Sequence, residues 1–165
     1  MTNPTTRDRL ATAQWILERN LAWIAAADVK VAVIATIDIG MLGGLAAAFG
    51  LPDAHKTPWA MFFVLATSMC LVAGLAQAAR SLAPRRDGPK TSLVFFGRIA
   101  KLEQYVYVEK LRDSTDEQLL EDWSQQIHRN AEIACTKFIL VQKAMVMSFI
   151  AVSPWIIAIV LLVKG

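Results

Sequence analysis

The sequence predicts an all-α membrane protein in which three transmembrane helices carry long helical cytoplasmic extensions. Hydrophobic residues make up 55 % of the 165 positions, and charged residues only 19 %. The mean hydropathy of +0.41 is high for a soluble globular chain. Three separate stretches are also apolar enough, and long enough, to cross the roughly 30 Å of hydrocarbon in a bilayer. The length corresponds to a single membrane domain, residues 1–165.

Each predicted span ends at a recognisable boundary. The first covers residues 31–51 and stops before Pro52. The second covers residues 58–82, and the third covers residues 144–163 and is closed by Lys164. Each is about the 20 residues that a membrane-crossing helix requires.

Basic residues predict how these spans are oriented. Four precede the first span, eleven lie from the end of the second span to the start of the third, and only Lys56 lies between the first two. The cluster closest to a span end runs from Arg80 to Lys90 and includes Arg85 and Arg86. Lysine and arginine concentrate on the cytoplasmic flanks of membrane proteins. We therefore expect the N-terminal and central polar segments to be cytoplasmic, and the C-terminus to lie on the opposite side.

The two polar segments, residues 1–30 and 83–143, carry helical patterns. In the first, apolar positions recur every three or four residues, and neither proline nor glycine occurs between Thr5 and Ile39. This predicts one helix that runs unbroken into the first span. In the second, "STDE" at Ser114–Glu117 predicts a capping box. It would start a helix of roughly 45 residues that reaches through the third span.

Shorter elements are expected between the second span and this capping box. "APRRDGPK" (83–90) has the composition of a turn. "TSLVFFG" (91–97) is too short for a span and is expected to be extended, whereas residues 98–113 are expected to form one short helix. The polar module would then join all three spans, so a ligand or partner bound there could move the membrane helices directly.

Three charged residues in or beside the first span raise the question of what they face. Asp28 and Lys30 lie at its mouth, where either can reach water and an interfacial ion pair is expected. Asp38 lies inside the span, and such a carboxylate faces protein or water rather than lipid. Two roles stay open for Asp38, a hydrogen-bonded packing contact or a group lining a water-filled path. Its candidate hydrogen-bonding neighbours are Thr67, Ser68, Gln77 and Ser148.

Small residues recur every fourth position along the same span. Gly40 and Gly44 form a G-x-x-x-G motif within this ridge, and small side chains let helix backbones approach closely in lipid. The partner could be another span of this chain or a second copy of it, and the sequence leaves both open. The whole ridge consists of Ala32, Thr36, Gly40, Gly44 and Ala48.

Several function classes find no support in the residues. No nucleotide-phosphate loop or zinc-protease motif occurs. The spacing of the two histidines and of Cys70 and Cys135 suits neither a metal site nor a disulfide. We expect no enzyme activity, cofactor or metal. The net charge of +3 is accounted for by the basic flanks of the spans, so no nucleic acid polymer is expected as a partner.

Three ordered motifs resemble the Pycsar-system transmembrane effector family. "AADVK" opens the first span, "SLVFFGRIA" follows the second, and "IACTKF" precedes the third. In the resemblance these correspond to an A-D-x-K-like motif with a later polar position, an F-G-x-I-A-like element, and a lysine followed by an aromatic residue. One departure is aspartate at the later position, where the family often has asparagine. The matching residues are Asp28, Lys30, Asp38, Phe96, Gly97, Ile99, Ala100, Lys137 and Phe138.

The resemblance implies a role in antiphage defence. A partner pyrimidine cyclase would make cyclic CMP or cyclic UMP. The effector, a multi-pass protein of the bacterial inner membrane and a homo-oligomer, would respond by impairing the bilayer, which causes abortive infection. Two other readings are a helical scaffold that recruits a partner, and a constitutive pore without ligand gating.

The chemistry of a cyclic mononucleotide suggests which residues would bind it. Its phosphate needs a cation, its base an aromatic face, and the base edge polar groups. Arg98 and Lys137 are favoured because each lies in a matching motif. A basic side chain here could instead be solvated or face a lipid headgroup, and an aromatic one could pack between helices. The other candidates are Lys101 and Arg129 for the phosphate, Phe96, Tyr105 and Tyr107 for stacking, and Gln104, Gln126 and Asn130 for the base edge.

Overall fold

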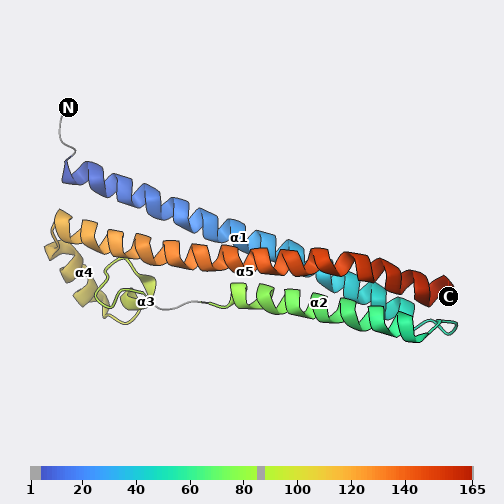
Figure 1. Ribbon diagram of the computed structural model, residues 1–165. Helices are drawn as coiled ribbons and strands as arrows, with labels where there is room; N and C mark the ends of the chain where they lie inside the picture. Colours follow the sequence, from blue (N-terminus) through green and yellow to red (C-terminus); the bar gives the residue numbers. More distant parts are fainter. Residues whose placement is uncertain (1–4, 85–87, 165) are drawn as a thin grey trace, which may run out of the picture. The chain divides into compact units, whose positions relative to one another are not determined.

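The computed structural model describes residues 5–84 and 88–164, and in these ranges it contains five helices and no strand (Figure 1). The all-α prediction is therefore confirmed for the described chain. Arg85 and Arg86 of the basic cluster lie outside the described residues. The helices are α1 (Thr6–Phe49), α2 (Pro58–Leu82), α3 (Phe96–Ile99), α4 (Gln104–Asp113) and α5 (Asp116–Lys164).

Helices α1, α2 and α5 are each long and apolar enough to cross a membrane. The bounds of α2 coincide with the predicted second span, because Thr57 and Pro58 give a strong start signal. The Thr57 side chain accepts a hydrogen bond from the amide of Ala60 at 3.2 Å, and proline is well suited to the first helical position. The first predicted span, residues 31–51, extends two residues beyond the end of α1 at Phe49, whereas the third lies inside α5. Both helices continue unbroken into the polar segments.

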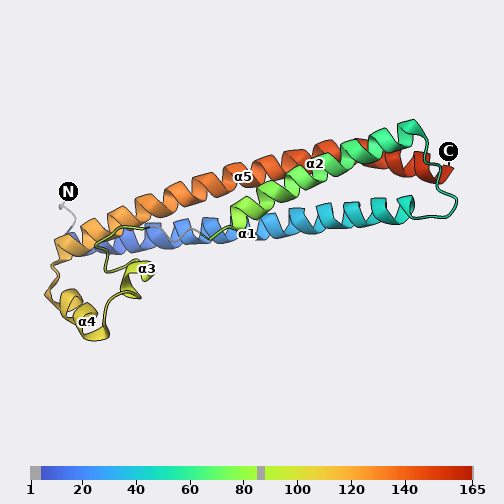
Figure 2. The same cartoon turned by 90° about the horizontal axis from the view of Figure 1, so that it is seen from below.

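The chain divides into two compact units, and α1 and α5 contribute to both. The first unit comprises Met1–Ala26 and Pro84–Thr136, and the second comprises Ala27–Ala83 and Lys137–Gly165. In the second unit, α2 lies beside the later halves of α1 and α5 (Figures 1 and 2). Its core is built largely from small and branched side chains, which allow close helix contact. The two buried clusters are Ala27, Val31, Ile34, Ala78, Val141 and Ala144, and Leu45, Ala48, Ala60, Ala158 and Leu162.

In the first unit, the early part of α1 pairs with the early part of α5. The Asn20 side-chain amide donates to the carbonyl of Ile127 at 3.1 Å, so a polar side chain holds the two helices together at a buried position. At the start of α1, Thr5 and Asp8 form a reciprocal capping box. The Thr5 amide and hydroxyl donate to the Asp8 carboxylate at 3.0 and 2.7 Å, and the Asp8 amide donates back to the Thr5 hydroxyl at 3.3 Å.

The capping box predicted at Ser114–Glu117 is wrong by one residue. The Thr115 hydroxyl instead accepts from the amide of Gln118 at 3.3 Å, and the Gln118 side chain accepts from the amide of Thr115 at 3.0 Å. Ser114 donates to the carbonyl of Leu111 at 2.7 Å and so closes α4. Two adjacent hydroxyl residues could each cap the helix, and Gln118 matches the second as well as glutamate matches the first.

The segment 91–113 also differs from expectation. The part expected to be extended forms a turn, because the buried Ser92 hydroxyl accepts hydrogen bonds from the amides of Val94 and Phe95 at 3.0 and 2.8 Å. A side chain that bonds to nearby amides competes with regular structure. The single helix expected over 98–113 is instead the separate helices α3 and α4.

Within one copy, the residues of the small-residue ridge lie in different surroundings. Gly40 is exposed, with no atom within 4 Å of an added Cβ, whereas Gly44 lies against Trp155, 3.3 Å from Cζ2. Ala48 is buried. A helix turns about 100° per residue, so positions four apart drift about 40° around the axis at each step. The ridge therefore begins on the outside of the bundle and ends in its core.

Candidate functional site

Asp28 on α1 and Lys137 on α5 form an ion pair in the second unit, although they are 109 residues apart in sequence. The side chain of Lys137 is only 10 % exposed and that of Asp28 is 39 % exposed. The first and third motifs thus meet in space. Lys137, which the sequence suggested as a phosphate partner, already has a carboxylate partner in this conformation.

The residues that adjoin this pair also meet. The Lys30 ammonium lies 5.3 Å from the centre of the Phe138 ring, within the range of a cation–π contact. Lys30 and Phe138 are both exposed, so this second contact lies at the surface of the unit. Four matching residues from two distant motifs therefore connect α1 to α5 through one partly buried contact and one exposed contact.

Asp38 is fully buried and faces α2 and α5. A Cβ added to Gly74 would lie 2.9 Å from its Oδ2 and 3.5 Å from the Cβ of Met147. Neither carboxylate oxygen has a hydrogen-bond partner among the described residues. The Ser148 side chain lies near the Asp38 carboxylate, but its hydroxyl donates to the carbonyl of Ala144 at 3.0 Å.

None of the other expected neighbours of Asp38 forms a hydrogen bond with it in the described ranges. Ser68 donates to the carbonyl of Val64 at 2.8 Å, and the Thr67 hydroxyl and the Gln77 carbonyl oxygen are themselves without partners there. Sequence reasoning missed Gly74, the residue that makes room for the carboxylate. A glycine inside an apolar span is a signal of close backbone approach.

The second motif contains a buried aromatic residue, Phe95, that sequence reasoning also missed. A Cβ added to Gly88 or to Gly97 would lie 2.7 Å from an atom of this ring, so both glycines are needed for its packing. Phe96, the predicted stacking residue, instead points outward with 66 % of its surface exposed. The two rings meet edge to face with centroids 5.0 Å apart.

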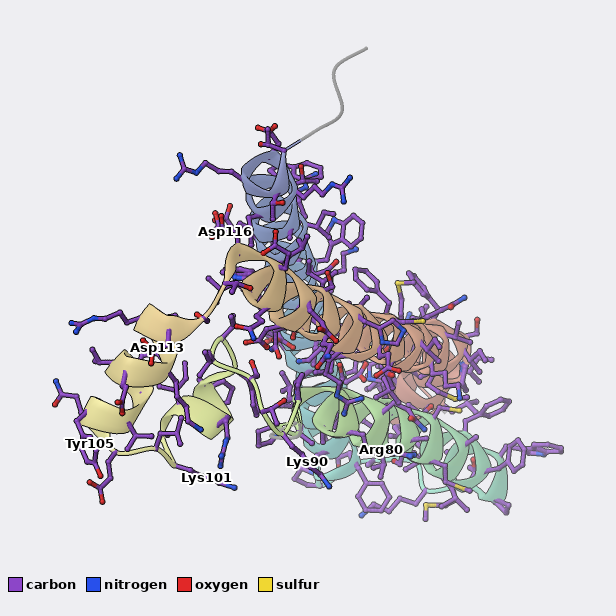
Figure 3. All side chains as sticks on the ribbon, turned by 90° about the vertical axis from the view of Figure 1, so that its left-hand side faces the viewer. Arg80, Lys90, Lys101, Tyr105, Asp113 and Asp116 are labelled. Carbon is purple, nitrogen blue, oxygen red and sulfur yellow. The ribbon has the colours of Figure 1, made fainter. Side chains whose placement is uncertain are left out.

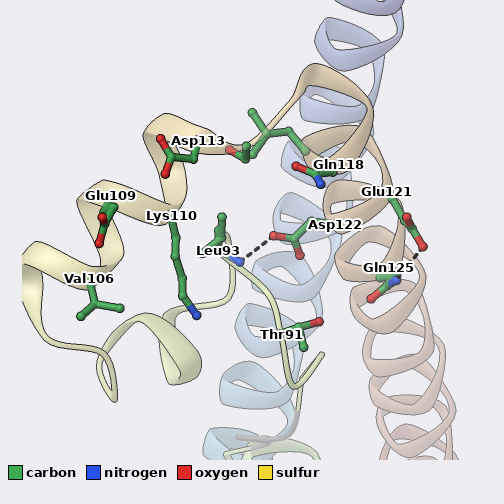
Figure 4. Close-up of a pocket in the computed structure, with 12 residues that line it drawn as sticks. Thr91, Leu93, Val106, Glu109, Lys110, Asp113, Gln118, Glu121, Asp122 and Gln125 are labelled. Atoms are coloured by element: carbon green, nitrogen blue, oxygen red, sulfur yellow. Dashed lines mark hydrogen bonds between the residues drawn. The ribbon is translucent and has the colours of Figure 1, made fainter.

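Asp122 attaches this motif segment to α5. Its Oδ2 accepts a hydrogen bond of 2.6 Å from the amide of Leu93 (Figure 4). The Tyr107 hydroxyl on α4 donates to the carbonyl of Leu93 at 3.3 Å. Tyr107 therefore has a structural contact in the first unit. Asp122 could not be found from sequence, because nothing in its helical pattern marks it as a partner for a distant backbone.

A cleft of about 580 Å³ lies beside this attachment, between α4 and α5 (Figure 4). Its charged lining consists of one lysine and four carboxylates, namely Lys110, Glu109, Asp113, Glu121 and Asp122. This negative lining is unsuited to a phosphate. No group of three or more potential metal ligands is placed to hold an ion in the part of the chain that the structure describes.

None of the ten candidate ligand residues lines that cleft. Tyr105 and Lys101 are exposed at the surface of the first unit (Figure 3), and Tyr105 borders a shallower cleft together with Gln104. Arg129 pairs with Glu132 at 2.7 Å.

The remaining candidates are divided between the two units. Arg98 is half-buried on α3 and belongs to the first unit, whereas Lys137 belongs to the second. Gln126 and Asn130, proposed for the base edge, are buried on α5 in the first unit.

Comparison with known families agrees with the motifs. The family model PycTM, described as the Pycsar effector protein domain, matches residues 12–164. Neither the curated proteins nor the solved structures compared with the chain include a match. The Pycsar transmembrane effector family is associated with a cyclic pyrimidine nucleotide signal from a cyclase partner and is not a known class of enzyme. With a match over nearly its full length and three helices able to cross a membrane, the chain belongs to the Pycsar effector family of antiphage membrane proteins.

Proposed function

We propose that this protein is activated by cyclic CMP or cyclic UMP from a partner pyrimidine cyclase and then impairs the bacterial inner membrane, which causes abortive infection. The observation that carries the proposal is the family match over residues 12–164. In the proposed topology the N-terminus and the segment 83–143 are cytoplasmic, where the nucleotide is made, and the C-terminus lies on the other side.

The Asp28–Lys137 pair suggests how a nucleotide would act. A phosphate that reached Lys137 would compete with Asp28 for the same ammonium group. Ligand binding shifts a conformational equilibrium only if the ligand binds one state more tightly than the other. In the paired state the Lys137 side chain is only 10 % exposed and its charge is offset by Asp28, so the nucleotide would favour a state in which α1 and α5 have separated at this point.

The acidic lining of the cleft beside α4 argues against that cleft as the phosphate site. Four carboxylates in that cleft would oppose a phosphate. The ligand residues that we propose remain those named from sequence, which are Lys137 in the second unit and, in the first, Arg98, Phe96, Lys101, Tyr105 and Arg129.

We also propose that the active form is a homo-oligomer. Leu71 and Leu162 are fully buried in the three-helix unit of one copy, so side chains occupy its interior at these described positions. Gly40 has an unoccupied surface beside it, and small residues at such a surface permit close helix association in lipid.

The experiment is the thermal stability of detergent-purified protein with cyclic CMP, UMP, AMP and GMP. One pyrimidine nucleotide at 100 times its Kd should stabilise the protein by about 2.7 kcal/mol, and the purine nucleotides should not. Lys137→Ala should abolish this shift, whereas Lys143→Ala, which removes an exposed lysine of the same helix, should retain it. No selective shift with folded protein would contradict nucleotide activation and favour a scaffold or a constitutive pore.

A further inference from the structure

An apolar groove runs along the second unit between α1 and α5, on the side where Lys30 lies over Phe138. Its volume is about 550 Å³. From α1 it is lined by Val33, Ile37 and Met41 among others, and from α5 by residues that include Met145 and Phe149.

The groove is about as long as one leaflet of the hydrocarbon core is thick. It extends along α1 from Val29 to Met41, which at 1.5 Å per residue is about 18 Å. Half of a hydrocarbon core of about 30 Å is about 15 Å. The groove runs along α1 and α5, which are both apolar enough to cross a membrane, and in such a placement its walls would face acyl chains rather than water.

A cation lies at the end of the groove that is formed by Val29 and Lys30. Lys30 is exposed and lines the groove together with Gln142. Its charge is not cancelled by Asp28, because that carboxylate pairs with Lys137. The contact with the Phe138 ring keeps the ammonium at the mouth. One end of the groove therefore suits a negative headgroup, and the rest suits a hydrocarbon chain.

We propose that this groove binds one anionic phospholipid, with its phosphate on Lys30 and an acyl chain between α1 and α5. Charge complementarity selects the headgroup, because a basic residue near an anionic lipid surface contributes about 1 kcal/mol, a factor of about five in affinity. The apolar walls select the chain but do not discriminate between headgroups. The proposal concerns the lipid around the resting protein and is independent of which nucleotide activates it.

Native mass spectrometry of the delipidated full-length protein tests this site. The protein is given equal amounts of phosphatidylglycerol and phosphatidylcholine with identical chains. The wild type should bind the anionic lipid about fivefold more tightly, and Lys30→Gln should reduce the preference to about one. Lys56→Gln is the matched control, since Lys56 lies 4.6 Å from the Phe49 ring centre but does not line this groove. It should leave the preference unchanged.

A second variant tests the groove rather than the charge. Ile37→Trp replaces an aliphatic side chain on the groove wall with a bulky indole ring. Because the position is exposed, the bundle should still fold. It should reduce binding of both lipids. An unchanged headgroup preference in Lys30→Gln would overturn the proposal. So would an Ile37→Trp protein that binds lipid normally but loses self-association, because the occupant would then be a second copy of the chain.

Discussion

Asp28 and Asp38 lie ten residues apart on α1, and their surroundings are opposite. Asp28 is partly exposed and its carboxylate has Lys137 as a partner. Asp38 is fully buried between α1, α2 and α5, and its carboxylate oxygens have no hydrogen-bond partner among the described residues. The first arrangement holds two helices together, whereas the second places a costly polar group at the centre of the bundle.

The difference indicates that the two aspartates of this motif have opposite effects on the packing of the bundle. A paired carboxylate at the mouth of a span stabilises the conformation in which its partner is near. An unpartnered carboxylate in the interior opposes the closed packing around it, and such a group inside a membrane span is a functional candidate. The bundle therefore contains one contact that favours closure and one group that opposes it.

The largest effect is expected from breaking the Asp28–Lys137 pair. Asp28→Asn leaves the Lys137 ammonium mostly buried without its carboxylate, which should cost about 2–3 kcal/mol, less than a fully buried pair because Asp28 is partly exposed. Unfolding in mixed detergent micelles measures the change. The Lys137→Gln and double variants complete a mutant cycle, and the double variant should recover part of the loss. Strict additivity of the two single effects would argue against the pair.

The opposite sign is expected at Asp38. Asp38→Asn keeps the shape of the side chain but removes a carboxylate that has no partner in the described structure, so it should stabilise the bundle by about 1–2 kcal/mol. The same unfolding assay measures this, with Asp53→Asn in the exposed loop as the control for aspartate replacement. A destabilising effect of Asp38→Asn would mean that the carboxylate binds an ion or water and is therefore, like Asp28, a partnered group.

A smaller effect tests the contact between Asp38 and Gly74. Gly74→Ala introduces a Cβ 2.9 Å from the carboxylate, and overpacking of this kind should cost about 1 kcal/mol. In an Asp38→Ala background the carboxylate is gone, so the same substitution should cost much less. Equal costs in the two backgrounds would show that another contact, such as that with Ala144, determines the effect.

The smallest effect concerns a third aspartate on α1, which is exposed. Hydrogen bonds from the side chain and then the backbone of Thr5 hold the pKa of the Asp8 carboxyl below its ordinary value of 3.8. The capping box therefore stabilises the helix start above that pH, and this contribution is lost as the pH falls through the lowered pKa. A carboxyl-carbon NMR titration should show the pKa return towards 3.8 in Thr5→Ala.

Thr12→Ala is the control for this titration. The Thr12 hydroxyl donates to the backbone carbonyl of Asp8 at 2.9 Å and not to its carboxylate. The pKa of the Asp8 carboxyl should therefore stay low in this variant. A rise in both variants would mean that fraying of the first turn, rather than the Thr5 hydrogen bonds, sets the titration.

Local patterns predicted the long helices well, because local signals determine where helices start and stop. The lack of proline and glycine before the first span correctly indicated an unbroken α1, and Pro58 marked the start of α2. Contacts between residues distant in sequence could not be predicted from such local patterns. No local signal could pair Asp28 with Lys137 across 109 residues, and the family motifs named both residues without saying that they meet.

The small-residue ridge shows the limit of periodicity in the same way. Spacing of four identified Gly40 and Gly44 as one surface, but the drift of the helix places them against different surroundings. The candidate nucleotide residues were chosen by side-chain chemistry. Chemistry alone could not show that one of them, Lys137, has a carboxylate partner in this conformation.

The most direct test of the proposed function is dye release from sealed vesicles that contain the purified protein. We predict that cyclic CMP or cyclic UMP, but not cyclic AMP or GMP, triggers release. We also predict that Lys137→Ala vesicles no longer respond to the nucleotide while Lys143→Ala vesicles respond normally. Release that is equal with and without every nucleotide, or absent with all of them in correctly inserted protein, would contradict the account of a ligand-gated effector.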